Sequence, residues 1–165
     1  TPSQDLVVSP PIFTIPPGAA QIVRIGLLRR PESDREITYR LFLQEVPRPP
    51  KPGEQGISVA LRLGLPVFIL PKGAAAPQLA WSARAEKGEL RLSLKNTGNA
   101  HVQVIECKIY GEDGKLIAEQ PLGAYVLSGQ TRSWMVKPDR AWQGGKLRLV
   151  AQTSAGDISA QIAPQ

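Results

Sequence analysis

The side chains that could carry out chemistry in this sequence are few and far apart. Its 165 residues include one cysteine, Cys107, and one histidine, His101. A lone cysteine cannot form an internal disulfide, and one cysteine with one histidine falls short of the ligand set that a structural zinc ion needs. We therefore expect no metal site and no cofactor.

These residues also have structural interpretations. Cys107 lies in the alternating run VQVIECKIY, which predicts a buried, unreactive thiol on one face of a strand. His101 follows the turn sequence NTGN, and the acids Glu112 and Asp113 belong to the turn GEDG with no evident catalytic partner. Without a Gly-rich phosphate loop or a Ser/His/Asp arrangement, the sequence predicts a protein that is not an enzyme.

The charge pattern argues against nucleic acid as a partner. The chain carries a formal net charge of +6, but each half, residues 1–72 and 73–165, carries +3 with the two signs interspersed. No apolar run reaches the roughly 18–20 residues needed to cross a bilayer, so we expect a protein that is not membrane-embedded. Residues 1–30 lack the layout of a secretion signal, and an export signal, if there was one, is not in this sequence.

Short runs rich in Val, Ile, Leu and aromatic residues alternate with Gly, Pro, Asn and Asp, which predicts an all-β chain and a sandwich architecture. The strands are expected at residues 6–8, 20–28, 37–46, 57–70, 79–85, 89–96, 101–110, 115–120, 124–127, 130–136, 146–153 and 157–162.

Proline marks a division of the chain. Thirteen of the 16 prolines lie at or before Pro77, which indicates a first domain at 1–72, a linker at 73–77 and a second domain at 78–165. The second is close to the ~100 residues of an immunoglobulin-like sandwich. The first is too short for a complete one, so we expect it to be a sandwich incomplete at its N-terminus.

The most informative stretch is GISVALRLGLPVFILP. Five apolar residues alternate with small or polar ones and give this strand one wholly apolar face: Ile57, Val59, Leu61, Leu63 and Leu65. A half-buried strand of any sandwich has this pattern. The unbroken face is unusually long, however, and it ends at Pro66, a residue suited to an edge strand. An edge strand can pair with a strand of another protein, which we call the guest strand.

The sequence resembles the PapD-like periplasmic chaperones of the chaperone-usher pathway, in a form similar to the archaic or spore-coat-type branch. The matching stretches are SPPIFTIPPGAAQIVRIGL, YRLFLQEVP, ISVALRLGLPVFILP, LKNTGNAHVQV and YVLSGQTRSW. This resemblance implies two immunoglobulin-like domains, a periplasmic location, and pilus or fimbrial subunits and an outer-membrane usher as partners. It also implies that the strand at 57–70 is lent to a subunit that lacks its own final strand.

The sequence departs from that family at the residues expected to anchor the subunit's terminal carboxylate. The family uses two basic residues; the aligned position on the lent strand holds Pro66, which leaves Arg62 and Arg24 as the nearest basic candidates. Glu45 matches an acid that ties the two domains together, but its usual basic partner aligns with Leu70.

Two alternatives remain open at this stage. An adhesin-like or scaffold module of immunoglobulin-like domains would bind partners through loops, or through the tryptophans Trp81, Trp134 and Trp142, which otherwise serve as core or rim aromatics. The apolar edge also permits self-association of the free chain through the lent strand.

Overall fold

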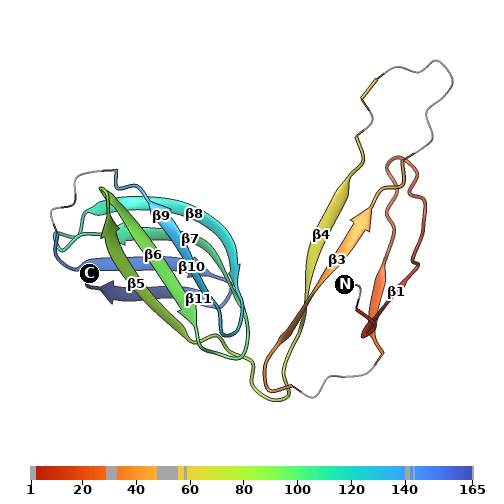
Figure 1. Cartoon of the computed structure of the whole chain (residues 1–165), viewed down its shortest axis with the longest axis horizontal. Helices are drawn as coiled ribbons and strands as arrows, with labels where there is room; N and C mark the ends of the chain where they lie inside the picture. The colour runs from red at the N-terminus through yellow and green to blue at the C-terminus, as the bar shows by residue number, and fades with distance from the viewer. Residues whose placement is uncertain are drawn as a thin grey trace. The chain divides into compact units, whose positions relative to one another are not determined.

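The computed structural model describes residues 3–28, 33–47, 56–57, 59–139, 142 and 144–164. All regular elements are β-strands, which confirms the all-β prediction (Figure 1). No described helix exists that would be long and apolar enough to cross a membrane. The strands are β1 (Leu6–Ser9), β2 (Arg24–Leu27), β3 (Ile37–Gln44), β4 (Arg62–Ile69), β5 (Leu79–Glu86), β6 (Glu89–Asn96), β7 (Val102–Tyr110), β8 (Leu116–Val126), β9 (Thr131–Val136), β10 (Leu147–Thr153) and β11 (Gly156–Ile162).

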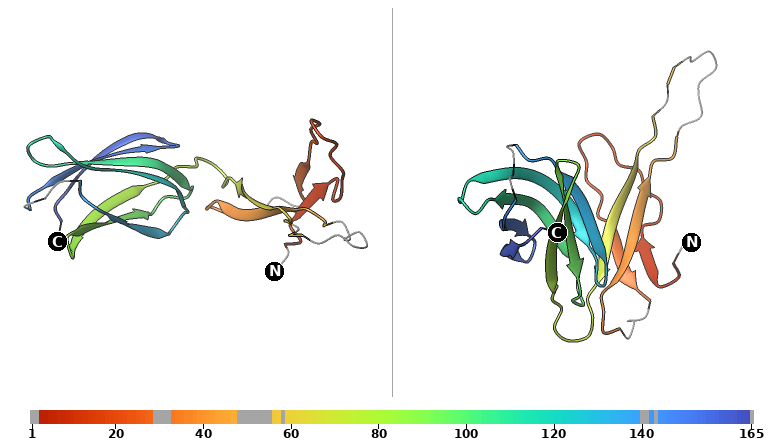
Figure 2. Two further views of the ribbon diagram at one scale, coloured as in Figure 1. Left: turned by 90° about the horizontal axis from the view of Figure 1, so that it is seen from above. Right: turned by 60° about the vertical axis from the view of Figure 1, so that its left-hand side comes forward.

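The strands from β5 onward form a β-sandwich. One sheet has the order β11-β10-β7-β8 and the other β5-β6-β9, with every neighbouring pair antiparallel (Figures 1 and 2). The strands alternate apolar and polar residues, so each sheet turns one apolar face inward. The central side chains of this core have relative exposures of 2% or less: Leu90, Leu92, Leu94, Val102, Val104, Ile109, Ile117, Val126, Val136, Leu147 and Leu149.

The single thiol and the tryptophans behave as their sequence context indicates. Cys107 is buried in the core, and burial, reinforced by the negative charge of Glu106, raises its pKa to about 11. The thiol therefore stays protonated and unreactive at neutral pH. Trp81, Trp134 and Trp142 are partly buried and pack against the core, so their contribution to the sandwich is that of rim aromatics.

Several strand boundaries differ from those expected; the strand predicted at 20–28, for example, covers only Arg24–Leu27. The segments predicted at 115–120 and 124–127 form the single strand β8, in which Gly123 adopts φ 52° and the register with β7 shifts. A bulge absorbs the turn-like residues without ending the strand. The strand predicted to begin at Ile57 begins instead at Arg62.

The chain divides into two compact units, Thr1–Glu32 and Ser33–Gln165. The first unit contains a two-stranded sheet of β1 and β2, in which Leu6 faces Leu27 and Ser9 faces Arg24. The second contains the sandwich and a two-stranded ribbon of β3 and β4. The domain boundary expected at 72–77 stays a prediction.

The turn NTGN at 96–99 holds the segment that leads from β4 into the sandwich. The side chain of Asn96 is fully buried; it donates to the carbonyls of Ala100 (2.8 Å) and Val126 (3.1 Å) and accepts from the amides of Gln78 (3.2 Å) and Gly98 (3.0 Å). Asn99 adds bonds to both sides of the same segment, donating to the Ala74 carbonyl and accepting from the Ala76 amide, each at 2.9 Å.

Gly98 is required in this turn because the backbone of residues 76–78 passes directly over it. A Cβ at this position would lie 2.3 Å from the Ala76 carbonyl oxygen and 2.4 Å from the Gln78 nitrogen. Only glycine permits so close an approach. The turn is therefore a docking site for the preceding segment as well as a connection between β6 and β7.

We expect Asn96→Ala to lower the free energy of unfolding by about 3 kcal/mol, because it leaves several buried backbone groups without partners. Urea unfolding followed by tryptophan fluorescence measures this. Asn99→Ala, at a partly exposed position, is the control and should cost about 1 kcal/mol. Equal losses in the two variants would contradict the assignment of Asn96 as the central residue of the turn.

Candidate functional site

The ribbon of β3 and β4 has one apolar face. The two strands pair antiparallel from Ile37 opposite Ile69 to Gln44 opposite Arg62. Residues directly opposite each other in an antiparallel pair project to the same face. Four successive apolar pairs therefore share one face: Ile37 with Ile69, Tyr39 with Val67, Leu41 with Leu65, and Leu43 with Leu63.

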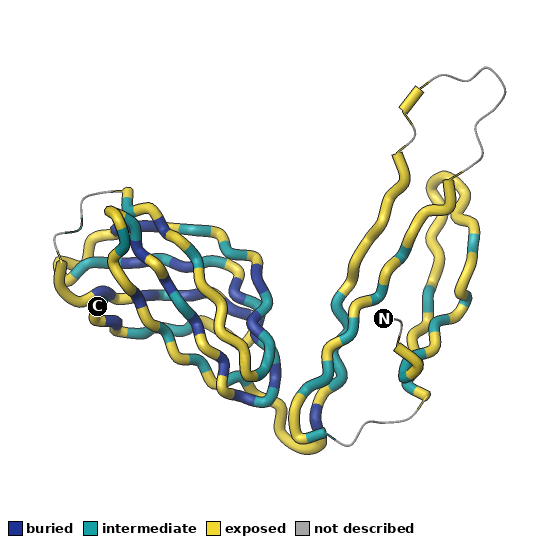
Figure 3. The backbone as a smooth tube through the Cα atoms, in the orientation of Figure 1, coloured by how far each residue is buried: buried dark blue, intermediate teal, exposed yellow. Residues whose placement is uncertain are grey.

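The exposure of the apolar side chains increases toward the N-terminal end of β4. Ile69 and Val67 are half-buried, Leu65 and Leu63 are each 45% exposed, and Leu61 is 57% exposed (Figure 3). Val59 and Ile57, which precede the strand, are 83% and 96% exposed. The residues named from the sequence thus form a single apolar series that lies progressively open to solvent.

Only one edge of β4 is occupied. Among the described residues, β4 pairs with β3 alone, and the two form a two-stranded sheet. The second edge of a strand in such a ribbon carries backbone N–H and C=O groups that no ladder uses. The expectation that this strand would be an edge strand is thereby met.

The opposite face of the ribbon is partly covered by its own side chains. The Arg62 guanidinium carbon lies 4.2 Å from the centre of the Phe42 ring. Phe42 in turn lies over Gly64, where an added Cβ would be 3.2 Å from a ring carbon. Arg62 and Phe42 thus form a cation–π pair on the face away from the apolar series.

Residues 59–61 continue the chain without strand pairing, which corrects the longer strand expected from the alternation; Ser58 lies outside the described residues. At Leu61 the last bonds to the neighbouring chain involve Glu45. The Glu45 amide donates to the Leu61 carbonyl (2.8 Å), and the Leu61 amide donates to the Glu45 carboxylate (3.1 Å). The Leu61 amide thus bonds to a side-chain oxygen instead of a backbone carbonyl, and the regular ladder between the two strands ends at this point.

A cluster at the other end of the ribbon connects it to the sandwich. The Glu36 side chain is 1% exposed, and its Oε2 lies 2.7 Å from Nδ1 of His101. The His101 ring stacks on Phe68, with ring centroids 3.5 Å apart, and both rings lie near Tyr125. We call these four residues the junction cluster. Phe68 belongs to β4 and Glu36 precedes β3, whereas His101 precedes β7 and Tyr125 lies near the end of β8. The cluster therefore joins the ribbon to the sandwich.

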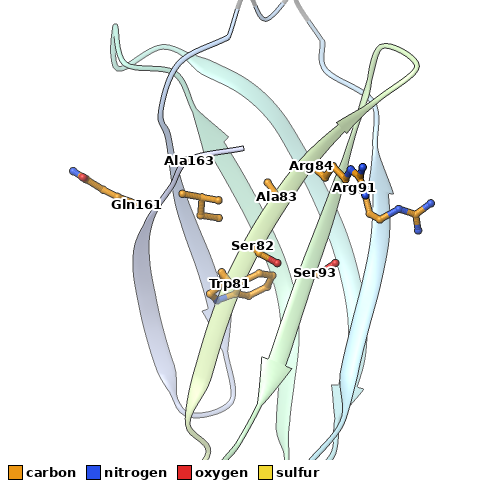
Figure 4. A pocket seen from close by; sticks show the side chains of 9 residues that line it. Trp81, Ser82, Ala83, Arg84, Arg91, Ser93, Gln161 and Ala163 are labelled. Carbon is orange, nitrogen blue, oxygen red and sulfur yellow. The ribbon is translucent and has the colours of Figure 1, made fainter. Parts of the chain in front are cut away.

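The sandwich also has a shallow pocket of about 350 Å³ beside β5, β6 and the end of β11 (Figure 4). Arg91, on its rim, forms a two-bond ion pair with Glu86 at 2.7 and 2.8 Å, and this hydrogen bonding holds the pKa of Glu86 below its usual value. No histidine, cysteine or acid is among the described residues that line it.

Comparison with known proteins gives a family match for the first part of the chain and structural matches for nearly all of it. Residues 1–75 match the family described as pili and flagellar-assembly chaperone, PapD N-terminal domain. The whole chain shares its fold with the YadV chaperone (18% identity, TM-score 0.65, covering 95% of this chain and 78% of that one). Residues 1–75 thus match the N-terminal domain of PapD-like chaperones, and the chain as a whole has the fold of such a chaperone.

Two further structures have the same fold. One is the CsuC–CsuE chaperone–tip adhesion subunit pre-assembly complex from the archaic Csu pili of Acinetobacter baumannii (22% identity, TM-score 0.60, covering 99% of this chain and 76% of that one). The other is the class 5 fimbriae chaperone CfaA (16% identity, TM-score 0.55, 98% and 74%). No curated protein matches the sequence. At identities of 16–22%, the likeness to these structures shows a shared fold.

The basic and acidic candidates belong to different elements of the chain. Arg62 is on β4 and contacts Phe42, whereas Arg24 is on β2 in the other compact unit. Their role as anchors stays a prediction. Glu45 bonds to Leu61 at the end of the ribbon, and its expected role in tying the domains together stays a prediction.

Sequence reasoning did not find the junction cluster. Glu36 and His101 are 65 residues apart, and neither lies in a motif that links it to the other. The available signal was weak: His101 is the chain's only histidine and directly follows the NTGN turn and Ala100. A lone histidine at the start of a strand has many explanations, and only the fold identifies its partner.

We expect His101→Ala to destabilise the protein by about 2 kcal/mol, because it leaves the buried Glu36 carboxylate without its donor. The second carboxylate oxygen already lacks a partner among the described residues. Urea unfolding of the full chain measures the loss. His101→Gln keeps a donor and should restore part of the stability, and a variant His101→Ala as stable as the wild type would contradict this role.

Proposed function

We propose that this chaperone binds pilus or fimbrial subunits in the periplasm by lending them β4 together with the residues that precede it, and then delivers them to an outer-membrane usher. The observation that carries the proposal is the combination of an open strand edge with an exposed apolar series along the same strand. The edge supplies backbone hydrogen bonds, and alternate side chains supply contacts to a groove, which is strand addition to an incomplete sheet.

The exposed side chains provide the driving force for this binding. Burial of a large aliphatic side chain contributes about 1.5–3 kcal/mol. Val59, Leu61, Leu63 and Leu65 together therefore offer about 6–12 kcal/mol before ordering and association costs. Val59 and Ile57 lie almost fully in solvent and gain most, whereas Leu63 and Leu65 are already half-covered and gain less. The residues before β4 therefore supply a large share of the affinity.

The fold neighbours support a subunit as the partner. The CsuC chaperone, which has this fold, forms a complex with a tip adhesion subunit. A chaperone that acts by holding a partner needs no catalytic residues, which agrees with a role that is not enzymatic. When no subunit is present, two copies of the chain could cover their apolar edges against each other.

We expect Leu63→Glu to abolish subunit capture while the sandwich remains folded, because a carboxylate on the apolar face cannot enter an apolar groove without a partner. Co-expression with pilus subunits of the source organism, followed by co-purification, measures capture. Gln44→Glu introduces the same side chain on the opposite face of the ribbon and is the matched control.

The proposal predicts that the control captures subunits as the wild type does. Tryptophan fluorescence of both variants checks that the sandwich is intact. If Leu63→Glu retained a subunit as well as Gln44→Glu does, the apolar face would not be the binding surface and the strand-lending role would be refuted.

A further inference from the structure

The backbone groups on the open edge of β4 follow from its register. The Glu45 amide donates to the Leu61 carbonyl, so Leu61 directs its backbone groups toward the chain that carries β3. In an antiparallel pair, residues alternate between those that exchange bonds with the partner and those that direct N–H and C=O to the other side. The inward set on β4 is Leu63, Leu65, Val67 and Ile69, and the outward set is Arg62, Gly64, Pro66 and Phe68.

Pro66 therefore occupies an outward position. It has no N–H, and the register of β3 with β4 continues through it without a shift, from Gln44 opposite Arg62 to Ile37 opposite Ile69. The proline costs the ribbon no hydrogen bond. The backbone N–H that proline lacks would have pointed to the open edge of β4, the edge with which a strand of a bound subunit would pair.

The outward position beyond Pro66 is held to the sandwich through its side chain. Phe68 is the last outward residue of β4, and its ring contacts His101 and Tyr125 in the junction cluster. In the other direction the outward set continues through Gly64 and Arg62 toward the exposed residues 59–61, which precede the strand. The open edge therefore extends from Pro66 toward the N-terminal end of β4, whereas on the C-terminal side of Pro66 it is short because the strand ends at Ile69.

We propose that Pro66 ends the backbone ladder that a guest strand forms on β4, so that the register of the guest is counted from this residue. The inference rests on the proposed function. The guest pairs with Gly64, Arg62 and the residues before them, and its side-chain pockets receive Leu65, Leu63 and Leu61. Pro66 is in this sense a specificity-determining residue: it fixes which part of the apolar series a subunit contacts.

The first test compares Arg62→Pro with Arg62→Ala. Both variants remove the guanidinium and its contact with Phe42, but only the first removes an outward amide from the proposed ladder. We expect Arg62→Pro to retain at least about fivefold less subunit than Arg62→Ala, the effect of one net backbone hydrogen bond. Equal capture by the two variants would overturn the inference. In both variants the ribbon must remain docked on the sandwich. The NMR signals of His101, the chain's single histidine, report whether its ring still stacks on Phe68.

The second test places an amide at the proposed end of the ladder. In the complex of the wild-type chain with a subunit that it retains, hydrogen exchange should slow at the Arg62 and Gly64 amides and not at Phe68. In Pro66→Ala, the new amide at position 66 should also be protected, and the subunit should dissociate about fivefold more slowly. Protection of Phe68 in the wild-type complex, or an unprotected amide at position 66 in Pro66→Ala, would overturn the inference.

The two proposals fail in different ways. A wild-type chain that retains no subunit refutes the strand-lending function and the register with it. A wild-type chain that retains a subunit, with Arg62→Pro equal to Arg62→Ala, leaves the function intact and refutes the register alone.

Discussion

The proposed function depends on a strand edge that, among the described residues, its own sheet leaves unpaired. An isolated two-stranded ribbon is marginally stable in water, and one with an apolar face is an aggregation hazard as well. β3 and β4 form such a ribbon, with side chains on its apolar face that are only half-buried. A protein keeps this arrangement when the missing contacts come from a partner.

The sandwich and the ribbon divide stability and binding between them. The fully buried core lies in the sandwich, and the ribbon contributes no residue to it. The connection between them is polar and specific: the NTGN turn holds the segment after β4, and Glu36 meets His101 beside the stacked Phe68. These contacts fix the base of the ribbon while its other end, toward Leu61 and Ile57, stays accessible. Guest binding can therefore reorganise the exposed end without loss of the core.

Alternation in the sequence predicted which face each side chain occupies, and the strands of the sandwich follow it closely. It did not predict where β4 begins. Ile57, Val59 and Leu61 alternate just as Leu63 and Leu65 do, but periodicity reports the face of a residue and not the presence of a neighbouring strand. The Glu45 carboxylate takes the place of a backbone acceptor at Leu61, a side-chain event that no pattern records. The Glu36–His101 contact was equally invisible, because it joins residues that only the tertiary fold brings together.

Pro66 also bears on how the free chain avoids pairing with itself. Natural edge strands are blunted by prolines and by charged side chains, and the outward set of β4 contains one of each, Pro66 and Arg62. Two copies that met edge to edge along the whole of β4 would each face a missing donor at position 66. A shorter guest that pairs only on the N-terminal side of Pro66 meets no such gap. If Pro66 ends the ladder as proposed, the same residue favours a subunit strand in the right register over extended pairing between two copies of this chain.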